Sequence, residues 1–446
     1  MSDLQTVSYD KIDPLENEKP FFVSENGKVY QIVQKREKKF PTFHVILFGI
    51  AIPLVTLIMG MIYIGGIWNP VEKVTELNYV IVNSDKGCYT PICAKMGLDE
   101  KTNIGNYYSL LDGKGGHFTM INGDRQKALD MIENHDYWAA LYVPENFTSD
   151  ILLNLNAVNK YTLVPVNVDF IYDEVRSYTT INFVKKAFNI MERAFFNTLV
   201  KKFDDKGSFN PLFLIDGINY KDVNIHPISG FGQNFATFIF LVIVWIGTIA
   251  TSIISHFYFP FEDHWLLKKD TKHPILKAMI AKIIFCGAIM IVIDVICSVI
   301  PFFCGGKFEI QKGYWAFLGF ILFFSLSGLG INNLLIHILP FIFFYLIAVT
   351  FMFLQLLSCG GLVDNDIQYD FFKIGRAFPM YYGVKEIRYI YWKSGHQYQG
   401  KNCLIIALWA AVTIIASIFM YYLELKVKRR RWLKNNKFLQ EKNEKQ

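Results

Sequence analysis

The stretch HDYWAALYVPENFTSD, residues 135–150, decides how this chain is organised. Its apolar part, Trp138 to Val143, has the length of a β-strand, and Pro144 ends it before a helix start at Glu145. A strand that leads at once into a helix is typical of a water-soluble α/β domain. The chain around it is 52% hydrophobic and 16% aromatic. We therefore expect a soluble α/β domain inserted into a membrane protein.

The remaining composition agrees with a membrane protein. Charged residues make up 19% of the 446 residues, below the roughly 25% of soluble domains. The net charge is +6, but the basic residues cluster in QKREKK at 34–39 and in KVKRRRWLKNNK at 426–437. Basic clusters beside apolar runs mark the cytosolic flanks of membrane spans. They lack the folded basic module that binds nucleic acids, and we expect no nucleic-acid partner.

Six apolar segments are long enough to span a bilayer, which takes ~20 helical residues. The first, 42–68, follows a polar tail and is too long for a secretory signal. The long run 314–361 is expected to form two spans divided near the Gly- and Asn-rich residues 328–333. The five later spans make up a membrane domain at 233–425, with expected bounds 235–259, 275–303, 314–336, 338–361 and 404–425.

The positive-inside rule sets the orientation of these spans. It places a disordered tail, 1–39, and a basic tail, 426–446, in the cytosol. The basic loop 266–273 falls on the same side, where it is either solvated or contacts a partner protein. The expected fold class is a polytopic α-helical membrane protein with six transmembrane helices. Its α/β domain, 69–230, lies between spans one and two and faces the extracellular or luminal side.

Strands and helices alternate within the inserted domain. On the outer side, Asn146-Phe147-Thr148 is an acceptor triplet for N-linked sugar at Asn146. Cys88 and Cys93 either form a local bridge or remain free thiols, and the sequence leaves both open. The expected strands are 77–87, 117–122, 138–143 and 161–173, and the expected helices are 123–135 and 176–203.

Three polar residues inside the expected spans are candidates for a transport path, namely Asp294, Lys282 and Gln355. A carboxylate in a membrane costs several kcal/mol unless it is protonated, paired or wet. Asp294 therefore either lines a proton or substrate path or is a neutral carboxyl that ties helices together. Lys282 lies about 18 Å from Asp294 along the helix and is expected to extend towards the cytosolic end. Gln355 and His337 are polar contacts between helices by default.

Aromatic and cationic residues alternate in AFPMYYGVKEIRYIYWKSG, 377–395, before the last span. One interpretation is an interfacial amphipathic helix whose aromatic rings lie at the depth of the lipid headgroups. The other is a substrate vestibule or lipid-headgroup site, because cationic and aromatic groups together suit phosphates and amphipaths. The residues concerned are Tyr381, Tyr382, Lys385 and Arg388.

Several segments, taken in order from about 45 to 425, resemble a known family. IWNPVEKVTELNYVIVNSDKG resembles the exit from span one in the membrane-protein family named for yeast nitrosoguanidine resistance. YWAALYVPENFTSDIL is similar to the strand and helix of that family, and AFPMYYGVKEIRYIYW to its Pro-x-Tyr stretch before the last span. IYDEVRSYTTIN resembles its Tyr-Asp-x-x-Arg-Asn motif, with Asp173 and Arg176 in place. Ser177 stands where the family commonly has Asn.

That family is similar to phage-infection-type proteins and to the permeases of type-2 ABC exporters. The resemblance implies a permease-like protein of the plasma membrane or an endomembrane, active in drug resistance through export of toxic compounds or through lipid distribution. The implied partners are membrane lipids, an amphipathic drug or lipid substrate, and a second copy of the chain or a separate ATPase subunit. The alternative is a receptor or scaffold that does not transport and whose extracellular domain binds a partner.

The sequence carries no catalytic motif that would make this chain an enzyme. It has no phosphate-binding G-x-x-x-x-G-K-[ST] loop, no H-E-x-x-H zinc helix, no G-x-S-x-G turn and no C-x-x-C pair. We therefore expect no catalytic residue, no metal and no cofactor. Transport would need an energy source that the chain does not encode.

Overall fold

The computed structural model divides into two compact units, Met1–Thr56 and Leu57–Gln446. The described residues are 21–25, 28–32, 42–89, 91–95, 98–99, 101–113, 115–157, 163–203, 217–228, 230–257, 266, 272–304 and 310–443. Most of the expected tail 1–39 and of the basic loop 266–273 therefore lies outside the described residues.

The first unit contains a β-hairpin and the start of the first helix. Strand β1 (Phe21–Glu25) pairs antiparallel with β2 (Lys28–Ile32), and helix α1 (Thr42–Ile67) crosses the boundary between the units. The expectation of a disordered tail is corrected at these two strands. The sequence signal was present, because Asn-Gly between two alternating runs is the strongest short-range hairpin signal.

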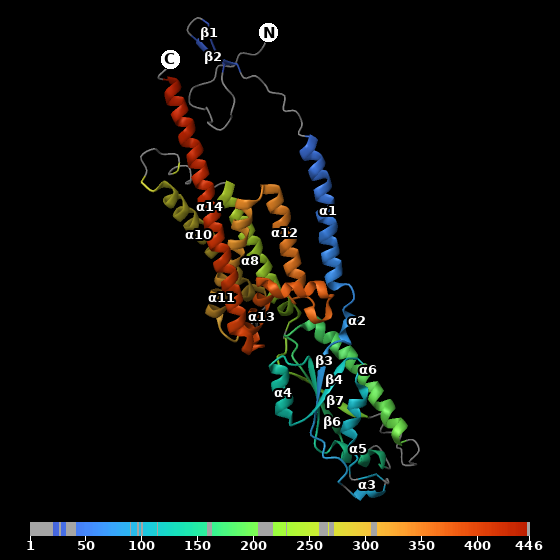
Figure 1. Ribbon diagram of the computed structural model, residues 1–446. Coiled ribbons are helices and arrows are strands. Elements are labelled where there is room, and N and C mark those ends of the chain that lie inside the picture. Colours follow the sequence, from blue (N-terminus) through green and yellow to red (C-terminus); the bar gives the residue numbers. More distant parts are fainter. Residues whose placement is uncertain are drawn as a thin grey trace. The chain divides into compact units, whose positions relative to one another are not determined.

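The inserted domain of the second unit is built on a β-sheet (Figure 1). The sheet has five strands in the order β4-β3-β5-β6-β7. The central strand β3 pairs parallel with β4 and β5, β5 pairs antiparallel with β6, and β6 pairs parallel with β7. The strands are β3 (Asn78–Asn83), β4 (His117–Asn122), β5 (Ala139–Val143), β6 (Val166–Tyr172) and β7 (Ile218–Asn224). The helices are α2 (Pro70–Val74), α3 (Pro91–Lys95), η2 (Ile104–Leu111), α4 (Arg125–Glu133), α5 (Phe147–Leu155) and α6 (Tyr178–Phe203).

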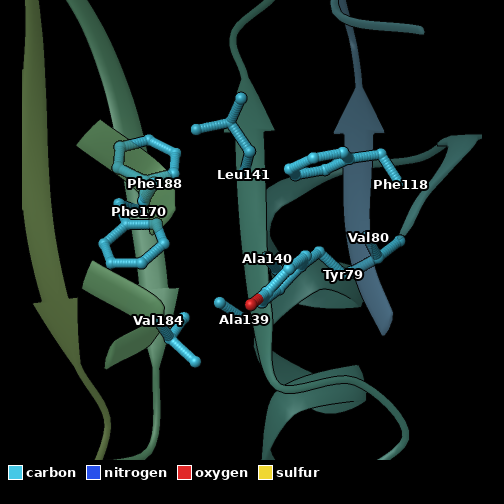
Figure 2. Close-up of a pocket in the computed structure, with 9 residues that line it drawn as sticks. All are labelled: Tyr79, Val80, Phe118, Ala139, Ala140, Leu141, Phe170, Val184 and Phe188. Atoms are coloured by element: carbon cyan, nitrogen blue, oxygen red, sulfur yellow. The ribbon is translucent and has the colours of Figure 1, made fainter. Parts of the chain in front are cut away.

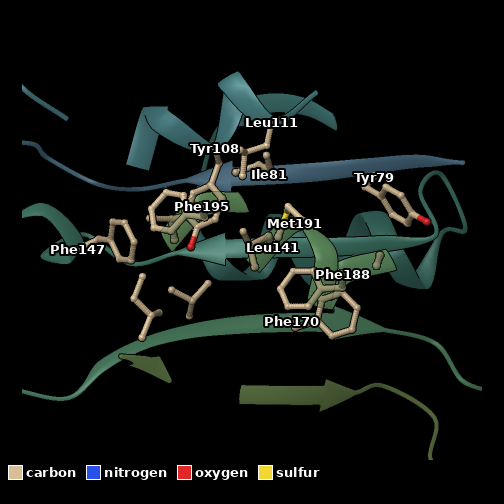
Figure 3. Packing of buried hydrophobic residues seen from close by; sticks show 14 of the residues in the cluster. Tyr79, Ile81, Tyr108, Leu111, Leu141, Phe147, Phe170, Phe188, Met191 and Phe195 are labelled. Carbon is tan, nitrogen blue, oxygen red and sulfur yellow. The ribbon is translucent and has the colours of Figure 1, made fainter. Parts of the chain in front are cut away.

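Both faces of this sheet are covered, as expected for parallel strands. Tyr79 and Ile81 of β3 point to one face and Val80 and Val82 to the other, because successive side chains of a strand alternate. The first face packs against α6 and η2 (Figure 3). Between these two helices, the ring of Tyr108 on η2 stacks on the ring of Phe195 on α6, with centroids 3.8 Å apart. The second face packs against α4 through Ala128 and Ile132. The alternating strand–helix prediction for this domain is confirmed.

The aromatic core of this domain contains a small gap between β3, β5, β6 and α6 (Figure 2). Its volume is about 10 Å³. A single water needs about this much room, and the lining is almost wholly apolar. The gap is therefore a packing defect and not a ligand site.

Five described helices are long and apolar enough to cross a membrane. This is consistent with a polytopic membrane protein. The described apolar part of α1, Ile52–Ile67, is shorter, and the sixth span remains a prediction. The five helices are α8 (Phe231–Phe257), α10 (Pro274–Cys304), α11 (Tyr314–Ile338), α12 (Phe341–Ser358) and α14 (Gln399–Asn443).

Two expected boundaries in this region are corrected. The long apolar run does form two helices, but the break lies at Leu339 and Pro340, where proline cannot continue a helix. Gly328 and Gly330 lie inside α11 and let α8 and α14 approach it. The expected basic tail is helical to Asn443 as a continuation of α14.

Close packing at Gly330 makes a testable prediction. A Cβ atom added there would lie 2.3 Å from Thr413 Oγ1 and 3.0 Å from the backbone nitrogen of Ile414 on α14. We expect Gly330→Ala to lower the free energy of unfolding by about 1–3 kcal/mol through overpacking. Gly319 of the same helix has no atom within 4 Å of an added Cβ. Thermal unfolding in detergent should show Gly319→Ala unchanged or more stable; equal losses in both variants would contradict the packing role.

Candidate functional site

The segment between α12 and α14 forms a compact platform on which the α/β domain rests. It contains η5 (Asn365–Ile367), η6 (Asp370–Ala377), α13 (Pro379–Trp392) and η7 (His396–Tyr398). The Asn365 amide donates to the carbonyl oxygens of Ser358 (2.9 Å) and Phe372 (2.7 Å), which closes the loop on itself. Val363 and Ile367 belong to the hydrophobic core of the α/β domain. The platform and the domain therefore share one core.

A cavity of about 90 Å³ lies where the platform meets the α/β domain. Arg176 comes from the domain, and Tyr381, Lys385 and Arg388 come from α13. Two sets of residues that the sequence had singled out separately thus line one cavity. The other lining residues are His135, Asp364, Asp366, Arg376, Ser394, Gly395 and Tyr398.

Three of the cations in this cavity have unused hydrogen-bonding capacity. Arg176 Nη1 donates to the carbonyl of Tyr137 at 2.7 Å, and Arg388 Nη2 donates to the carbonyl of Gly360 at 2.8 Å. A guanidinium has five N–H donors, so most remain available. Lys385 makes no hydrogen bond to a described residue, and its Nζ lies 4.4 Å from the centroid of the Tyr381 ring. None of the three has a described carboxylate oxygen within 4.0 Å.

The two carboxylates of the cavity are already engaged. Asp366 Oδ1 accepts from Arg376 Nη2 at 2.6 Å, and its Oδ2 accepts from Trp138 Nε1 at 3.2 Å. Asp364 Oδ1 accepts from the backbone nitrogen of Asp366 at 3.1 Å. The lining thus carries four cationic residues against two carboxylates, and neither described carboxylate lies within 4.0 Å of the Lys385 or Arg388 nitrogens.

Burial makes these positive charges costly when nothing opposes them. It lowers the pKa of Lys385 to about 8, and the neighbouring Arg176 and Arg388 act in the same direction against the charge of Asp364. Burial also lowers the pKa of Arg388, although arginine stays protonated in proteins. An anion in the cavity would relieve the repulsion among these groups. The arrangement can therefore bind an anionic group.

A buried carboxylate, Asp173, joins the domain to the platform beside this cavity. Asp173 is 1% exposed and its Oδ2 accepts from Ser394 Oγ at 2.5 Å. His135 Nε2 lies 3.1 Å and His226 Nδ1 lies 3.2 Å from the same oxygen. Burial raises the pKa of Asp173, but the two histidines outweigh it and hold that pKa well below its usual range.

The combination of Ser394, His135 and Asp173 does not have the geometry of a hydrolase triad. In such a triad the serine and the carboxylate bond to opposite nitrogens of the imidazole. Here Ser394 Oγ lies 3.0 Å and Asp173 Oδ2 lies 3.1 Å from the same His135 nitrogen, Nε2. The serine also donates directly to the carboxylate. These residues form a seam between the domain and the platform and do not activate a nucleophile.

The polar residues of the spans are not brought together. Asp294 is fully buried and Gln355 is 1% exposed, and neither side chain has a hydrogen-bond partner among the described residues. Ser325 lies beside Asp294, but its hydroxyl donates to the carbonyl of Leu322. Lys282 is 4% exposed, and its Nζ lies 3.2 Å from His337 Nε2.

The remaining predicted site residues have structural surroundings of their own. The Tyr382 hydroxyl donates to the carbonyl of Arg376 and does not line the cavity. Asn146 is exposed at the start of α5, where its Oδ1 accepts from the Tyr89 hydroxyl at 2.6 Å. Thr148 is fully buried, and its hydroxyl donates to Asp85 at 2.5 Å. The threonine of the acceptor triplet therefore has a role in the fold independent of any sugar.

Cys88 and Cys93, whose state the sequence left open, are disulfide-bonded. Among the residues that sequence reasoning missed are Arg376, His135 and Tyr398, together with Asp364, Asp366 and Ser394. Arg376 immediately precedes the aromatic stretch that was quoted, and its charge was the available signal. His135 begins the stretch quoted first, and only the fold brings it to Ser394.

The fold combines an inserted α/β domain with apolar helices that are consistent with a multi-pass membrane protein. Residues 48–415 match the model of the family described as "Protein of unknown function (DUF3533)". The chain belongs to this family. No curated protein and no solved structure matches the chain.

The seam at Asp173 predicts a pH dependence of stability. Burial lowers the pKa of His135 to about 4, from 6.5 for an ordinary histidine. Between these values the unfolded chain binds a proton that the folded chain does not, so this group destabilises the fold as pH falls from 6.5 to 4. His226 has the opposite sign: burial lowers its pKa, but Asp173 outweighs this and raises it. The stabilisation of the fold by protonated His226 is fully present below about pH 6.5. It is lost as the pH rises through the raised pKa of His226.

We expect His135→Asn to flatten the acid slope of the melting temperature between pH 6.5 and 4. Asparagine suits the left-handed backbone at this position, where φ is 58°. His117→Gln is the matched control, because that side chain is 60% exposed and lies away from the seam. Thermal unfolding at several pH values measures both. An acid slope in His135→Asn as steep as in the wild type would show that another group controls it.

Proposed function

We propose that this chain is a permease-like membrane protein that exports toxic amphipathic compounds or distributes lipids across the membrane. The observation that carries the proposal is the cation-rich cavity between the α/β domain and the platform of the helical bundle. Clefts between domains with a few convergent charged groups are the usual places for small-molecule binding. The resemblance to the nitrosoguanidine-resistance family supports the same function.

The chemistry of the cavity selects the polar end of the substrate. Arg176, Lys385 and Arg388 have free donors and no carboxylate partner, so they favour a phosphate or carboxylate over a cation. A hydrogen bond to a charged group contributes about 1.5–3 kcal/mol. Tyr381 and Tyr398 add aromatic surface beside the charges. An amphipath with an anionic head fits this lining.

The proposed topology has both termini in the cytosol and the α/β domain on the outer or luminal side of the plasma membrane or an endomembrane. The basic clusters at 34–39 and 426–437 support it, since cytosolic flanks are rich in Lys and Arg. The disulfide Cys88–Cys93 supports it independently, because such bonds persist mainly in oxidising compartments. The cavity would then face the outer headgroup region.

Transport by this chain would draw its energy from a gradient or from a separate ATPase subunit, since the sequence contains no phosphate-binding loop of its own. Asp294 and Gln355 remain candidates for the path across the membrane. Their buried polar atoms without described partners support this, because such groups are costly unless they serve a function.

Lys385 provides the direct test of the cavity. Its ammonium makes no hydrogen bond to a described residue, so Lys385→Met removes a charge without breaking a described contact of that kind. We expect at least a tenfold loss of export or lipid redistribution at unchanged surface abundance, equivalent to about 1.4 kcal/mol. The measurement is accumulation of labelled drugs and lipids in cells with and without the chain.

The matched control is Lys401→Met, the same substitution at an exposed lysine outside the cavity lining. It should transport like the wild type. Wild-type transport in Lys385→Met would remove the cavity from the mechanism. Accumulation that is the same with and without the chain would favour the receptor or scaffold function.

The orientation is tested at the acceptor triplet. In a host that adds N-linked sugars, we expect glycosidase to shift the wild-type band on a gel and to leave Asn146→Gln unmoved. Thr148→Ser is the matched control, because it keeps both the triplet and the hydroxyl that bonds to Asp85. It should shift like the wild type. A band that shifts in Asn146→Gln as in the wild type would contradict glycosylation at this site.

A further inference from the structure

A second polar site lies in the helical bundle, formed by Lys282, His337 and Glu424 of α10, α11 and α14. Lys282 Nζ lies 3.2 Å from His337 Nε2, and His337 Nδ1 lies 2.6 Å from Glu424 Oε2. His256 near the end of α8 completes the group, with its ring centroid 5.6 Å from that of His337. Because α8 starts just after the α/β domain, this site lies towards the opposite end of the bundle from the cavity.

The donors and acceptors of the three residues fix a proton arrangement. A lysine ammonium can only donate, so His337 Nε2 accepts and Nδ1 carries the ring proton. Nδ1 then donates to the Glu424 carboxylate. If Lys282 passes a proton to Nε2 while Nδ1 passes its proton to Glu424, the products are a neutral amine, the other histidine tautomer and a carboxylic acid. No proton is created or lost and no other reactant is needed.

Exposure changes along this chain of residues. The Glu424 side chain is 39% exposed, the His337 side chain is 1% exposed and Lys282 is 4% exposed. Lys282 and His337 also line a largely apolar cavity of about 180 Å³ between α10, α11 and α14. The three residues therefore connect a partly exposed carboxylate to a largely apolar cavity among α10, α11 and α14.

Charged and titratable groups from α8, α10 and α14 lie around His337. They are His256 of α8, Lys282 of α10, and Tyr421 and Glu424 of α14. The Tyr421 ring stacks on His337 with centroids 4.9 Å apart and lies 4.1 Å from Lys282 Nζ. The aromatic face stabilises the ammonium, so the charge is compatible with burial.

A metal ion is the alternative ligand for this group. His256, His337 and Glu424 offer ligand atoms that all lie within 4.8 Å of one another. However, the ammonium of Lys282 lies 3.2 Å from His337 Nε2, where a divalent cation would be repelled. The other nitrogen is already bonded to Glu424. These contacts favour a proton over a metal.

The geometry points to Glu424, His337 and Lys282 as a proton relay between the end of the bundle and the membrane cavity. The proposal that these residues bind and transfer a proton is based on the Lys282–His337 and His337–Glu424 contacts. A role in driving transport rests on the proposed function. The relay would then supply the energy source that the sequence does not encode, with a proton gradient as the driving force.

The test uses the full chain in liposomes that contain a pH-sensitive dye. The probe is a fluorescent single-chain amphipath with a phosphate head. Its transport and the internal pH are followed with and without an imposed proton gradient, for the wild type and for Glu424→Gln. Glutamine keeps the acceptor for His337 Nδ1 but cannot take up the proton. His117→Gln, at an exposed histidine of the α/β domain, is the control.

We expect the gradient to change wild-type and His117→Gln transport at least tenfold, and Glu424→Gln transport less than twofold. Wild-type transport that ignores the gradient, or Glu424→Gln that responds fully, would overturn the relay and leave the proposed function standing. Proton flux that Glu424→Gln abolishes, in liposomes that move no probe, would support the relay and overturn the proposed function. Retention of one zinc ion per chain that Glu424→Gln loses would overturn the relay in favour of a metal site.

Discussion

The buried carboxylate of Asp173 is the contact on which the candidate site depends. Its Oδ2 atom receives the Ser394 hydroxyl of the platform and lies against His135 and His226 of the α/β domain. Removing one partner of a buried charge costs about 3–5 kcal/mol, because the remaining charge is left unopposed. This seam therefore fixes the position of the domain on the platform. Without it, Arg176 would not face Lys385 and Arg388.

Charge is divided unequally on the two sides of this seam. Asp173 accepts from Ser394 and lies against His135 and His226, and Asp366 pairs with Arg376, while three cations of the cavity have no carboxylate oxygen within 4.0 Å among the described residues. The polar contacts of the seam therefore lie beside a cavity whose excess of positive charge favours an anion. The second polar site, at Lys282, His337 and Glu424, has balanced charges and a short hydrogen-bonded chain. Its chemistry suits a proton better than an anion.

Local sequence patterns predicted the elements well where one physical signal dominated. Parallel strands such as β3 are buried on both faces and read as apolar runs, and long apolar helices have no soluble counterpart. Strand β7 was missed because it is polar and lies at the edge of the sheet. The turn placed near Gly328 was wrong because glycine in a membrane helix serves close packing, whereas Pro340 ends the helix.

The candidate site was predictable only in parts. Arg176 and Lys385 were singled out by separate motifs, but their meeting depends on tertiary contacts between segments about 200 residues apart. The same applies to Lys282, whose partners His337 and Glu424 lie on other helices. Helical periodicity predicts on which face of its helix a residue lies. It does not predict which residue of another helix that side chain will contact.

The central claim is that the cavity binds an anionic head. Equilibrium binding to the purified chain should be compared for amphipaths with one common tail and either a phosphate or a quaternary ammonium head. We expect the phosphate head to bind at least tenfold more tightly and added salt to reduce the difference. Equal affinities, or a preference for the cationic head, would contradict it.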